Sequence, residues 1–322
     1  MNEFELIARY FQRAARSADV RVGIGDDAAV FAPTPGMEYA VTVDMLVEGR
    51  HFAVDADPRN LGHKALAVNL SDLAAVGALP RYVLLAGALP RADEAWVEAF
   101  MAGFDALARQ YDVELIGGDT TRGPRNLCIT AIGELPAGSA LTRAGANPGD
   151  RVYVSGSLGD AALALAVADG TIEVDDDSLA SLGHRLDLPE PRVALGVALR
   201  DIASAAIDIS DGLVGDLGHV VAASKVGAIV KLAAIPCNKA LRAGLGGSDR
   251  ERALQCLLAG GDDYELLFTV PPSKGETIEA LALALRVPLT PIGEIIAEPG
   301  IVVRDERGRR LAALPDAFDH FR

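Results

Sequence analysis

Cysteine is scarce in this sequence of 322 residues, and its three cysteines, Cys128, Cys237 and Cys256, stand far apart. They form no CxxC pair and no Cys/His spacing of the kind that binds a metal ion, which excludes a disulfide framework. Free cysteine behaves as a small apolar residue in protein interiors. We therefore expect all three cysteines to be buried structural residues.

Long apolar runs and positive charge are lacking as well. No apolar run reaches the roughly 18–20 residues that a transmembrane helix needs, and acids and arginines occupy the N-terminal segment where a signal peptide has its apolar core. The net charge is −15, whereas an extended nucleic-acid-binding surface needs clustered Lys and Arg. We therefore expect a cytoplasmic protein with neither a membrane nor a nucleic acid as partner.

The length and the order of the elements predict two α/β domains. A chain of 322 residues exceeds the roughly 100–200 residues of a typical single domain, and 50% apolar with 23% charged residues is an ordinary globular composition. Strand-like and helix-like segments alternate, and residues 136–150 are rich in Gly, Pro and small residues. We place the domain boundary there, with residues 1–146 as an N-terminal domain and 147–322 as a C-terminal domain.

Three local patterns give further expectations. Residues Glu3–Arg16 are typical of a helix, and the polar run at 173–179 is typical of a loop. The segment Val113–Asp119 predicts a strand that ends in a Gly-Gly-Asp turn.

Six segments carry aspartates in small or apolar surroundings. Aspartate is rarely buried unless it is paired or bound to a metal ion, and Lys and Arg are scarce near these positions. A set of carboxylates without histidine favours a hard cation, Mg²⁺ or Mn²⁺, over zinc. Each segment alone is equally typical of a turn or a helix cap, so the joint pattern carries the hypothesis. The aspartates are Asp26 and Asp27, Asp44, Asp72, Asp119, Asp208 and Asp211, and Asp262 and Asp263.

Magnesium held by a few carboxylates usually completes its coordination with water and substrate phosphates, which indicates phosphoryl transfer or hydrolysis. The sequence has no GxxxxGK[ST] loop, no GxGxxG after a strand and no protein-kinase motif set. A nucleotide would therefore bind through metal ions and through backbone amides of a glycine turn such as Gly117-Gly118. Arg143 is either the cationic partner of the outer phosphates or a solvated arginine in a linker.

Taken together, these segments resemble the thiamine-monophosphate kinase family, within the aminoimidazole ribonucleotide synthetase-like superfamily. The resemblance implies a two-domain α/β fold in which the N-terminal domain forms a dimeric β-barrel-like core. It implies transfer of the γ-phosphate of ATP to thiamine monophosphate, with several Mg²⁺ ions. The motifs that carry the resemblance are "GIGDDAAV", "VTVDMLVEGRHF", "KALAVNLSDLAAVGA", "LIGGDTTRG", "ALTRAGANPGD", "AIDISDGLVGDLGH", "GGDDYELLF" and the terminal "FDHF".

The resemblance also implies roles for individual residues. The metal ligands would be Asp27, Thr42, Val43, Asp44, Asp72, Asp119, Asp208 and Asp211, whose six aspartates form the catalytic set. The ATP contacts would be Gly118, Asp119, Arg143 and Ser210, with Tyr111 near the base. Thiamine monophosphate would contact His51, Asp262 and an aromatic residue near the C-terminus. Relatives often have tryptophan where this chain has Pro315, so the aromatic role falls to Phe318 or is lost.

A site rich in aspartate and poor in histidine suits this reaction chemically. The second pKa of a phosphate monoester lies near ~6, so the attacking phosphate is already largely dianionic at neutral pH and needs no base. What remains is the repulsion between two polyanions, which divalent ions neutralise while they hold the groups in line. We therefore expect direct transfer without a phosphoenzyme.

Other functions remain open at this point. Aminoimidazole ribonucleotide synthetase fits the motifs less well, and the cysteine positions disfavour selenophosphate synthetase and the hydrogenase maturation relative. A two-metal phosphohydrolase would normally have more histidine, with only His51 near the predicted site. A non-catalytic divalent-ion-binding protein is the last alternative, although the aspartates do not follow an EF-hand order.

Overall fold

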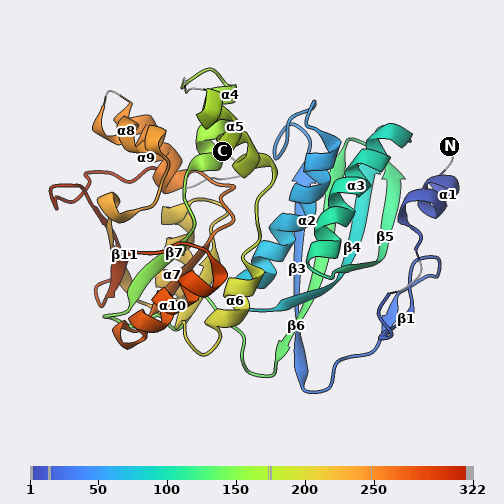
Figure 1. Cartoon of the computed structure of the whole chain (residues 1–322), viewed down its shortest axis with the longest axis horizontal. Helices are drawn as coiled ribbons and strands as arrows, with labels where there is room; N and C mark the ends of the chain where they lie inside the picture. Colours follow the sequence, from blue (N-terminus) through green and yellow to red (C-terminus); the bar gives the residue numbers. More distant parts are fainter. Residues whose placement is uncertain (1–2, 14–15, 173, 175, 248, 317–322) are drawn as a thin grey trace. The chain divides into compact units, whose positions relative to one another are not determined.

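A computed structural model describes residues 3–13, 16–172, 174, 176–247 and 249–316 (Figure 1). The chain divides into two compact units. The N-terminal unit comprises Met1–Leu73 and Ala78–Ser139, and the C-terminal unit comprises Ala74–Gly77 and Ala140–Arg322.

The N-terminal unit contains a four-stranded sheet in the order β3-β6-β4-β5 and a separate two-stranded sheet of β1 and β2. Strands β4 and β5 are parallel and are connected through α3, whereas β6 is antiparallel to both of its neighbours. The elements are α1 (Glu3–Leu6), the π-helix η1 (Ile7–Phe11), β1 (Val20–Val22), β2 (Val30–Phe31), β3 (Met37–Val47), α2 (Pro58–Ala75), β4 (Leu79–Leu89), α3 (Glu94–Gln110), β5 (Glu114–Arg122) and β6 (Asn126–Pro136). The last residues of α2, from Ala74, belong to the C-terminal unit.

Helices α2 and α3 contact each other closely. A Cβ atom on Gly62 would lie 1.9 Å from the carbonyl oxygen of Phe100, and one on Gly103 would lie 1.8 Å from that of Arg59. Glycine is therefore required at both positions for the two backbones to touch. Helix α3 begins where the side chain of Asp93 accepts a hydrogen bond from the backbone of the first turn.

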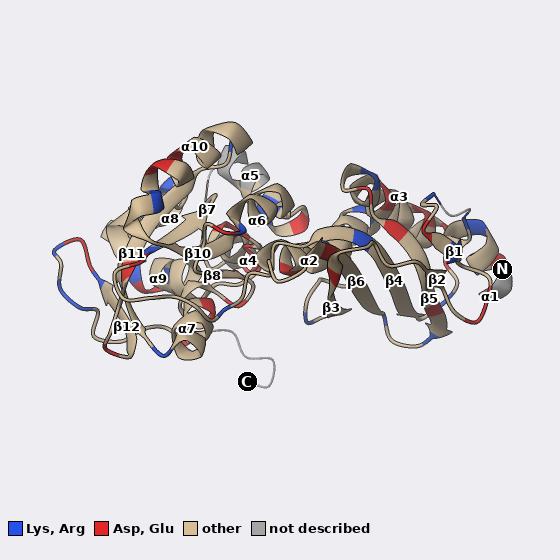
Figure 2. Ribbon diagram, turned by 90° about the horizontal axis from the view of Figure 1, so that it is seen from below, with Lys and Arg blue, Asp and Glu red and all other residues tan. Residues whose placement is uncertain are grey.

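The four-stranded sheet is covered on one face only. In Figure 2, α3 lies over one face, and no described helix of this unit lies over the other. Side chains alternate between the two faces of a strand, and in β3 the outward residues Val41, Val43 and Met45 are 64%, 58% and 53% exposed. Leu46, on the covered side, is buried. The uncovered face thus carries a row of large apolar side chains.

The C-terminal unit contains a six-stranded sheet in the order β12-β9-β11-β7-β10-β8. Its strands are antiparallel except for the parallel pair β12 and β9. Buried Val152, Val154, Ile207, Leu267 and Ile292 contribute to one apolar core in this unit. The elements are β7 (Arg151–Ser155), α4 (Asp160–Ala168), α5 (Asp176–Asp187), α6 (Val193–Leu199), β8 (Ala205–Asp208), α7 (Leu213–Ser224), β9 (Gly227–Lys231), η2 (Leu232–Ala234), α8 (Lys239–Gly246), α9 (Arg250–Ala259), β10 (Leu266–Val270), η3 (Pro272–Lys274), α10 (Gly275–Leu285), β11 (Leu289–Ile296) and β12 (Gly300–Arg304).

The prediction of one helix over Glu3–Arg16 is wrong for residues 12, 13 and 16, while residues 14 and 15 lie outside the described residues. The helical segment ends at Phe11, and Gln12 has an extended backbone with φ −68° and ψ 125°. The backbone N–H of Arg16 donates to the carboxylate of Glu114 at 2.7 Å, and its guanidinium donates to the backbone of the same strand end. These tertiary hydrogen bonds hold the chain in a non-helical path that local pattern does not reveal.

The prediction of a loop over residues 173–179 is wrong in its second half, because α5 begins at Asp176. Residues 173 and 175 lie outside the described residues. Leu182 is buried, and Leu186 packs against the same core one turn later. Burial of this apolar side outweighs the polar character of the helix start.

The three cysteines are free, but only Cys256 is buried, whereas Cys128 and Cys237 are half-buried. Burial raises the pKa of each of the three thiols. The expectation of three buried cysteines is therefore correct only for Cys256.

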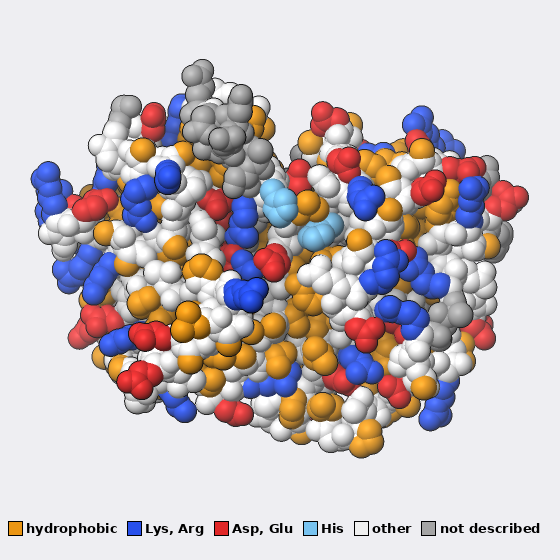
Figure 3. Space-filling model, in the orientation of Figure 1, with side chains coloured by type: hydrophobic (Ala, Val, Ile, Leu, Met, Phe, Trp, Pro, Cys, Tyr) orange, Lys and Arg blue, Asp and Glu red, His pale blue; other side chains and the backbone are white. Residues whose placement is uncertain are grey.

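Acidic and basic side chains are interspersed on the face drawn in Figure 3. The net charge of −15 therefore does not form one continuous acidic surface on this face.

None of the helices in the described part of the chain combines the length and the apolar character needed to span a bilayer.

Candidate functional site

In the N-terminal unit, three of the predicted metal ligands lie together. The hydroxyl of Thr42 donates to the carboxylate of Asp72. Asp44 lies two residues further along β3, on the same side as Thr42, and its backbone N–H donates to Asn69 Oδ1 at 3.2 Å. Asn69 and Asp72 are three residues apart on α2 and therefore share one side of that helix. This group offers only oxygen donors in its side chains, which suits a hard cation.

The Gly-Gly-Asp segment is part of a strand, so the predicted turn is wrong. Strand β5 continues to Arg122, and its register against β4 shifts at Ile116, which is a bulge. A Cβ on Gly118, where φ is +154°, would lie 1.9 Å from the carbonyl oxygen of Leu85. Only glycine allows the two backbones to approach this closely.

The register places Asp119 away from Asp44. Asp119 pairs with Ala86, which pairs with Cys128, which pairs with Met45. Residues in one such row point to one face, so Asp119 lies on the uncovered face with Met45, whereas Asp44 points to the other face. The strands β3 and β5 are three strand spacings apart, about 14 Å at ~4.8 Å per spacing.

A recess is lined by residues of α3 and of the strands β4, β5 and β6. It is mostly apolar, with Asp119 and Thr120 as its polar lining. The other lining residues are Phe11, Leu85, Gly87, Leu89, Trp96, Val97, Phe100 and Leu127. Because Trp96, Val97 and Phe100 belong to α3, the recess lies on the covered face of the sheet, opposite to the face to which the Asp119 side chain points.

Three further predicted residues of this unit stand at separate places. Asp27 lies in the exposed loop between β1 and β2, where its N–H donates to Asp26 Oδ1 at 2.9 Å. His51 follows β3, and its Nδ1 accepts a hydrogen bond from the backbone N–H of Val47 at 3.0 Å. An accepting Nδ1 means that the neutral ring carries its proton on Nε2. Tyr111 ends α3 as its C-cap.

In the C-terminal unit, Asp208, Ser210 and Asp211 lie at and just beyond the end of β8. Asp208 is buried, and the backbone N–H groups of Ser210 and Asp211 both donate to Asp216 Oδ2 at 3.1 Å. Burial raises the pKa of Asp216 to about 7, although these hydrogen bonds lower it. The Asp216 carboxylate therefore holds the turn that carries the candidate residues, and sequence reasoning missed this role.

Arg143 lies near this turn. Its positive charge lowers the pKa of Asp216, against the larger effect of burial. The backbone carbonyl of Arg143 accepts a hydrogen bond from Ser224 Oγ at 3.2 Å, while the residue itself is exposed. The structure thus brings a cationic side chain close to the turn that carries Ser210, a predicted ATP contact.

Asp262 lies against the same turn. Its backbone N–H donates to the carbonyl oxygen of Ser210 at 2.9 Å, and its carboxylate accepts a hydrogen bond from the hydroxyl of Tyr264 at 2.9 Å. Its neighbour Asp263 is a structural residue, because both oxygens of this buried carboxylate accept from the backbone N–H of Gly159 at 2.9 Å.

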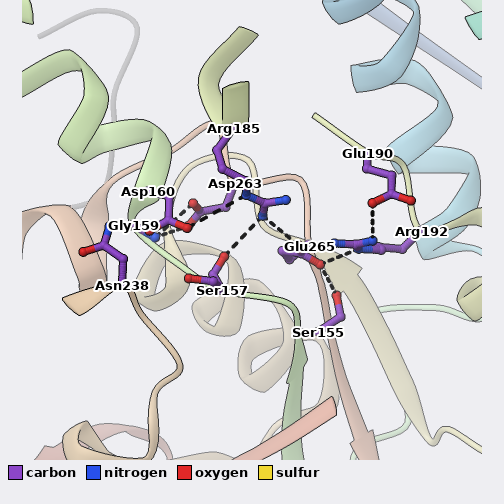
Figure 4. A network of polar contacts seen from close by, with 10 residues as sticks. All are labelled: Ser155, Ser157, Gly159, Asp160, Arg185, Glu190, Arg192, Asn238, Asp263 and Glu265. Atoms are coloured by element: carbon purple, nitrogen blue, oxygen red, sulfur yellow. Dashed lines mark hydrogen bonds and ion pairs between the residues drawn. The ribbon is translucent and has the colours of Figure 1, made fainter. Parts of the chain in front are cut away.

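A polar network that includes Asp263 and Glu265 follows directly along the chain (Figure 4). The carboxylate of Glu265, 1% exposed, accepts two hydrogen bonds from Arg192 and one from Arg185, all at 2.7 Å, and one from Ser155 at 2.5 Å. Burial alone would raise the pKa of Glu265, but the hydrogen bonds and charges of the two arginines outweigh it and leave the pKa below its ordinary value. Glu265 is thus a buried anion with four donors.

The described residues contain no group of three or more His, Cys, Asp and Glu close enough to hold a metal ion. The predicted ligands form smaller groups, with Thr42, Asp44 and Asp72 in one unit and Asp208 and Asp211 in the other. Such small oxygen groups fit Mg²⁺, which usually takes one or two carboxylates and completes its shell with water and phosphate oxygens. Phe318 lies outside the described residues.

Comparison with known proteins defines the class to which this fold and site belong. Residues 25–135 match the family described as AIR synthase related protein, N-terminal domain, and residues 147–306 match the corresponding C-terminal domain. The chain therefore belongs to the AIR synthase related family. The predicted superfamily and two-domain mixed α/β fold are confirmed. A barrel-like core is not found among the described residues, where every sheet is open.

Within this family, the chain is similar to thiamine-monophosphate kinases. The enzyme of Salmonella typhimurium is 49% identical over 99% of this chain and 98% of its own length. The crystal structure of thiamine-monophosphate kinase from Stenotrophomonas maltophilia is 47% identical with a TM-score of 0.83, covering 93% of this chain and 94% of that one. A structure of AaThiL complexed with AMPPCP and TMP is 29% identical with a TM-score of 0.78, covering 90% and 89%.

Proposed function

We propose that this chain transfers the γ-phosphate of ATP to thiamine monophosphate, giving thiamine diphosphate and ADP. The observation that carries the proposal is the similarity to thiamine-monophosphate kinases over the full length of the chain, at up to 49% identity. The AaThiL complex supports the choice of substrates, because it contains TMP together with AMPPCP, an ATP analogue. The oxygen-rich groups of both units supply the chemistry that such a transfer needs.

Mg²⁺ is the proposed metal, with Mn²⁺ as a possible replacement. Thr42, Asp44 and Asp72 would hold it in one unit, and Asp208 and Asp211 in the other. Asp27, Asp119 and the backbone of Val43 complete the proposed set of ligands. Bound there, the metal ions neutralise charge on the phosphates and keep the reacting groups in line.

The substrates have separate proposed contacts. ATP would contact Gly118 and Asp119 on β5, Ser210 beside Asp208, and Arg143, whose guanidinium suits phosphate oxygens. Tyr111 is the proposed contact of the base. Thiamine monophosphate would contact His51, Asp262 and Phe318. In this arrangement the chain's own side chains bind and orient two polyanions, and none has to remove a proton, because the attacking phosphate is already largely ionised near neutral pH.

A homodimer is proposed through the uncovered face of the β3-β6-β4-β5 sheet. Val41, Val43 and Met45 are more than half exposed there, and a contiguous apolar surface on a sheet marks an interface. A second copy of the same face would bury these side chains and place Asp119, which points to that face, at the interface. A dimeric β-barrel-like core would require this pairing.

The test is an incubation of the purified protein with ATP, Mg²⁺ and thiamine monophosphate. The proposal expects ADP and thiamine diphosphate to appear together. Loss of ATP without thiamine diphosphate would favour a Mg²⁺-dependent phosphohydrolase instead. Turnover only with a ribonucleotide substrate in place of thiamine monophosphate would favour an aminoimidazole ribonucleotide synthetase-like activity.

A further inference from the structure

The segment between α9 and β10 has an unusual backbone. Two of its non-glycine residues adopt the left-handed conformation, Asp262 with φ 66° and Tyr264 with φ 50°. This conformation is sterically unfavourable for a residue with a Cβ atom, and more so for a bulky tyrosine. Such residues persist only where the surrounding structure holds them, and they are found most often at functional sites.

The alternate residues of the segment hold this backbone in place. Asp263, 5% exposed, accepts the backbone N–H of Gly159, and Glu265 accepts hydrogen bonds from Arg185 and Arg192 (Figure 4). These two buried carboxylates lie on either side of Tyr264 in the sequence. Both anchors therefore fix the chain next to the strained residues.

The backbone of the segment also binds the turn after β8. The N–H of Tyr264 donates to the carbonyl oxygen of Ile209 at 2.8 Å, and the N–H of Asp262 donates to that of Ser210 at 2.9 Å. A Cβ on Gly261 would lie 2.3 Å from the Ser210 carbonyl oxygen, so the two backbones are in direct contact. Any movement of the segment as a whole would therefore also move Ser210.

The side chain of Tyr264 also contacts the side chain of Asp262. The tyrosine is 9% exposed, and its hydroxyl donates to Asp262 Oδ1 at 2.9 Å. A hydrogen bond to a carboxylate restricts its rotation, and a buried ring keeps the donor in one place. The left-handed backbone thus places the hydroxyl of Tyr264 within hydrogen-bond distance of the Asp262 carboxylate.

We propose that Tyr264 is a positioning residue for thiamine monophosphate: its hydroxyl holds the Asp262 carboxylate in the orientation that binds the substrate. This inference rests on the proposed function, in which Asp262 contacts thiamine monophosphate. The substrate carries a cationic thiazolium ring and an amino group on its pyrimidine, and a carboxylate attracts both. Tyr264 itself does not touch the reacting atoms.

The test is the steady-state kinetics of Tyr264→Phe, which keeps the buried ring and removes only the hydroxyl. The KM for thiamine monophosphate should rise about tenfold, the factor expected when one hydrogen bond to a charged group is lost. The kcat and the KM for ATP should stay within about twofold, because the backbone contact with Ser210 is intact. Tyr153→Phe is the matched control, because Tyr153 on β7 is another buried tyrosine of the C-terminal unit, 5% exposed. It should leave both KM values unchanged.

Two outcomes would overturn the inference while the proposed function stands. In the first, wild-type protein makes thiamine diphosphate and Tyr264→Phe has an unchanged KM for thiamine monophosphate. In the second, the KM values for both substrates rise equally, which would make Tyr264 a structural support of the whole segment. Wild-type protein that makes no thiamine diphosphate would instead overturn the proposed function, and the inference with it.

Discussion

Replacing Glu265 by glutamine tests whether the network in Figure 4 stabilises the C-terminal unit. The two carboxylate oxygens accept four hydrogen bonds, three of them from arginines at 2.7 Å. Glutamine keeps one accepting oxygen, and its NH₂ group would face donors that it cannot bind. Removing one partner of a buried ion pair costs about 3–5 kcal/mol. For a unit of this size, that corresponds to a fall in melting temperature of roughly 6–20 °C.

The matched control is Glu190→Gln. Glu190 also binds Arg192, at 2.9 Å, but its side chain is 62% exposed. An exposed pair contributes about 0–1 kcal/mol, so this variant should melt within roughly 4 °C of the wild type. Thermal unfolding followed by circular dichroism measures both variants. Equal shifts for Glu265→Gln and Glu190→Gln would refute the reasoning that burial makes the Glu265 pair important.

Three further predictions follow from the site and the sheet. Asp119→Asn should abolish turnover and leave the melting temperature nearly unchanged, because the carboxylate is exposed; a large fall in melting temperature would make Asp119 a structural residue. Met45→Asp places a charge on the uncovered sheet face, where Met45 is 53% exposed, and should convert a dimer to a monomer in analytical ultracentrifugation; an unchanged mass would exclude this face as the interface. Burial raises the pKa of Asp263 well above its ordinary value of 3.8, so the folded state binds the proton more tightly than the unfolded chain does. Stability therefore falls as the pH rises from the pKa of the unfolded chain toward the higher pKa of the folded state. The melting temperature of Asp263→Asn relative to wild type should therefore increase with pH over this range, and a difference independent of pH would contradict the assignment.

The two-domain α/β fold could be predicted from the sequence, whereas the arrangement of the candidate residues could not. Asp44 and Asp72 stand out locally as carboxylates in apolar surroundings, whereas Thr42 was included only through the family resemblance. The position of Asp119 depends on strand order and register, which bring together residues far apart in the sequence. No local pattern shows that it lies on the opposite face from Asp44.

The buried polar residues were missed for a related reason. Glu265 binds Arg185 and Arg192, which are 80 and 73 residues away, so its role depends on the tertiary fold. The left-handed backbone of Tyr264 also depends on these contacts, because tyrosine has no intrinsic preference for it. Asp216 had a weak local signal, since it follows Asp211 within the apolar segment "DGLVGDLG".

The fate of the γ-phosphate distinguishes direct transfer between the substrates from hydrolysis and from a phosphoenzyme. ATP labelled in its γ-phosphate is incubated with the protein, Mg²⁺ and thiamine monophosphate, and the products are separated after acid and, in parallel, alkaline quenching. If transfer is direct, the label appears in thiamine diphosphate, mole for mole with ADP, and none is bound to protein. Label released as inorganic phosphate, or retained on an aspartate or histidine of the chain during turnover, would contradict direct transfer between the two substrates.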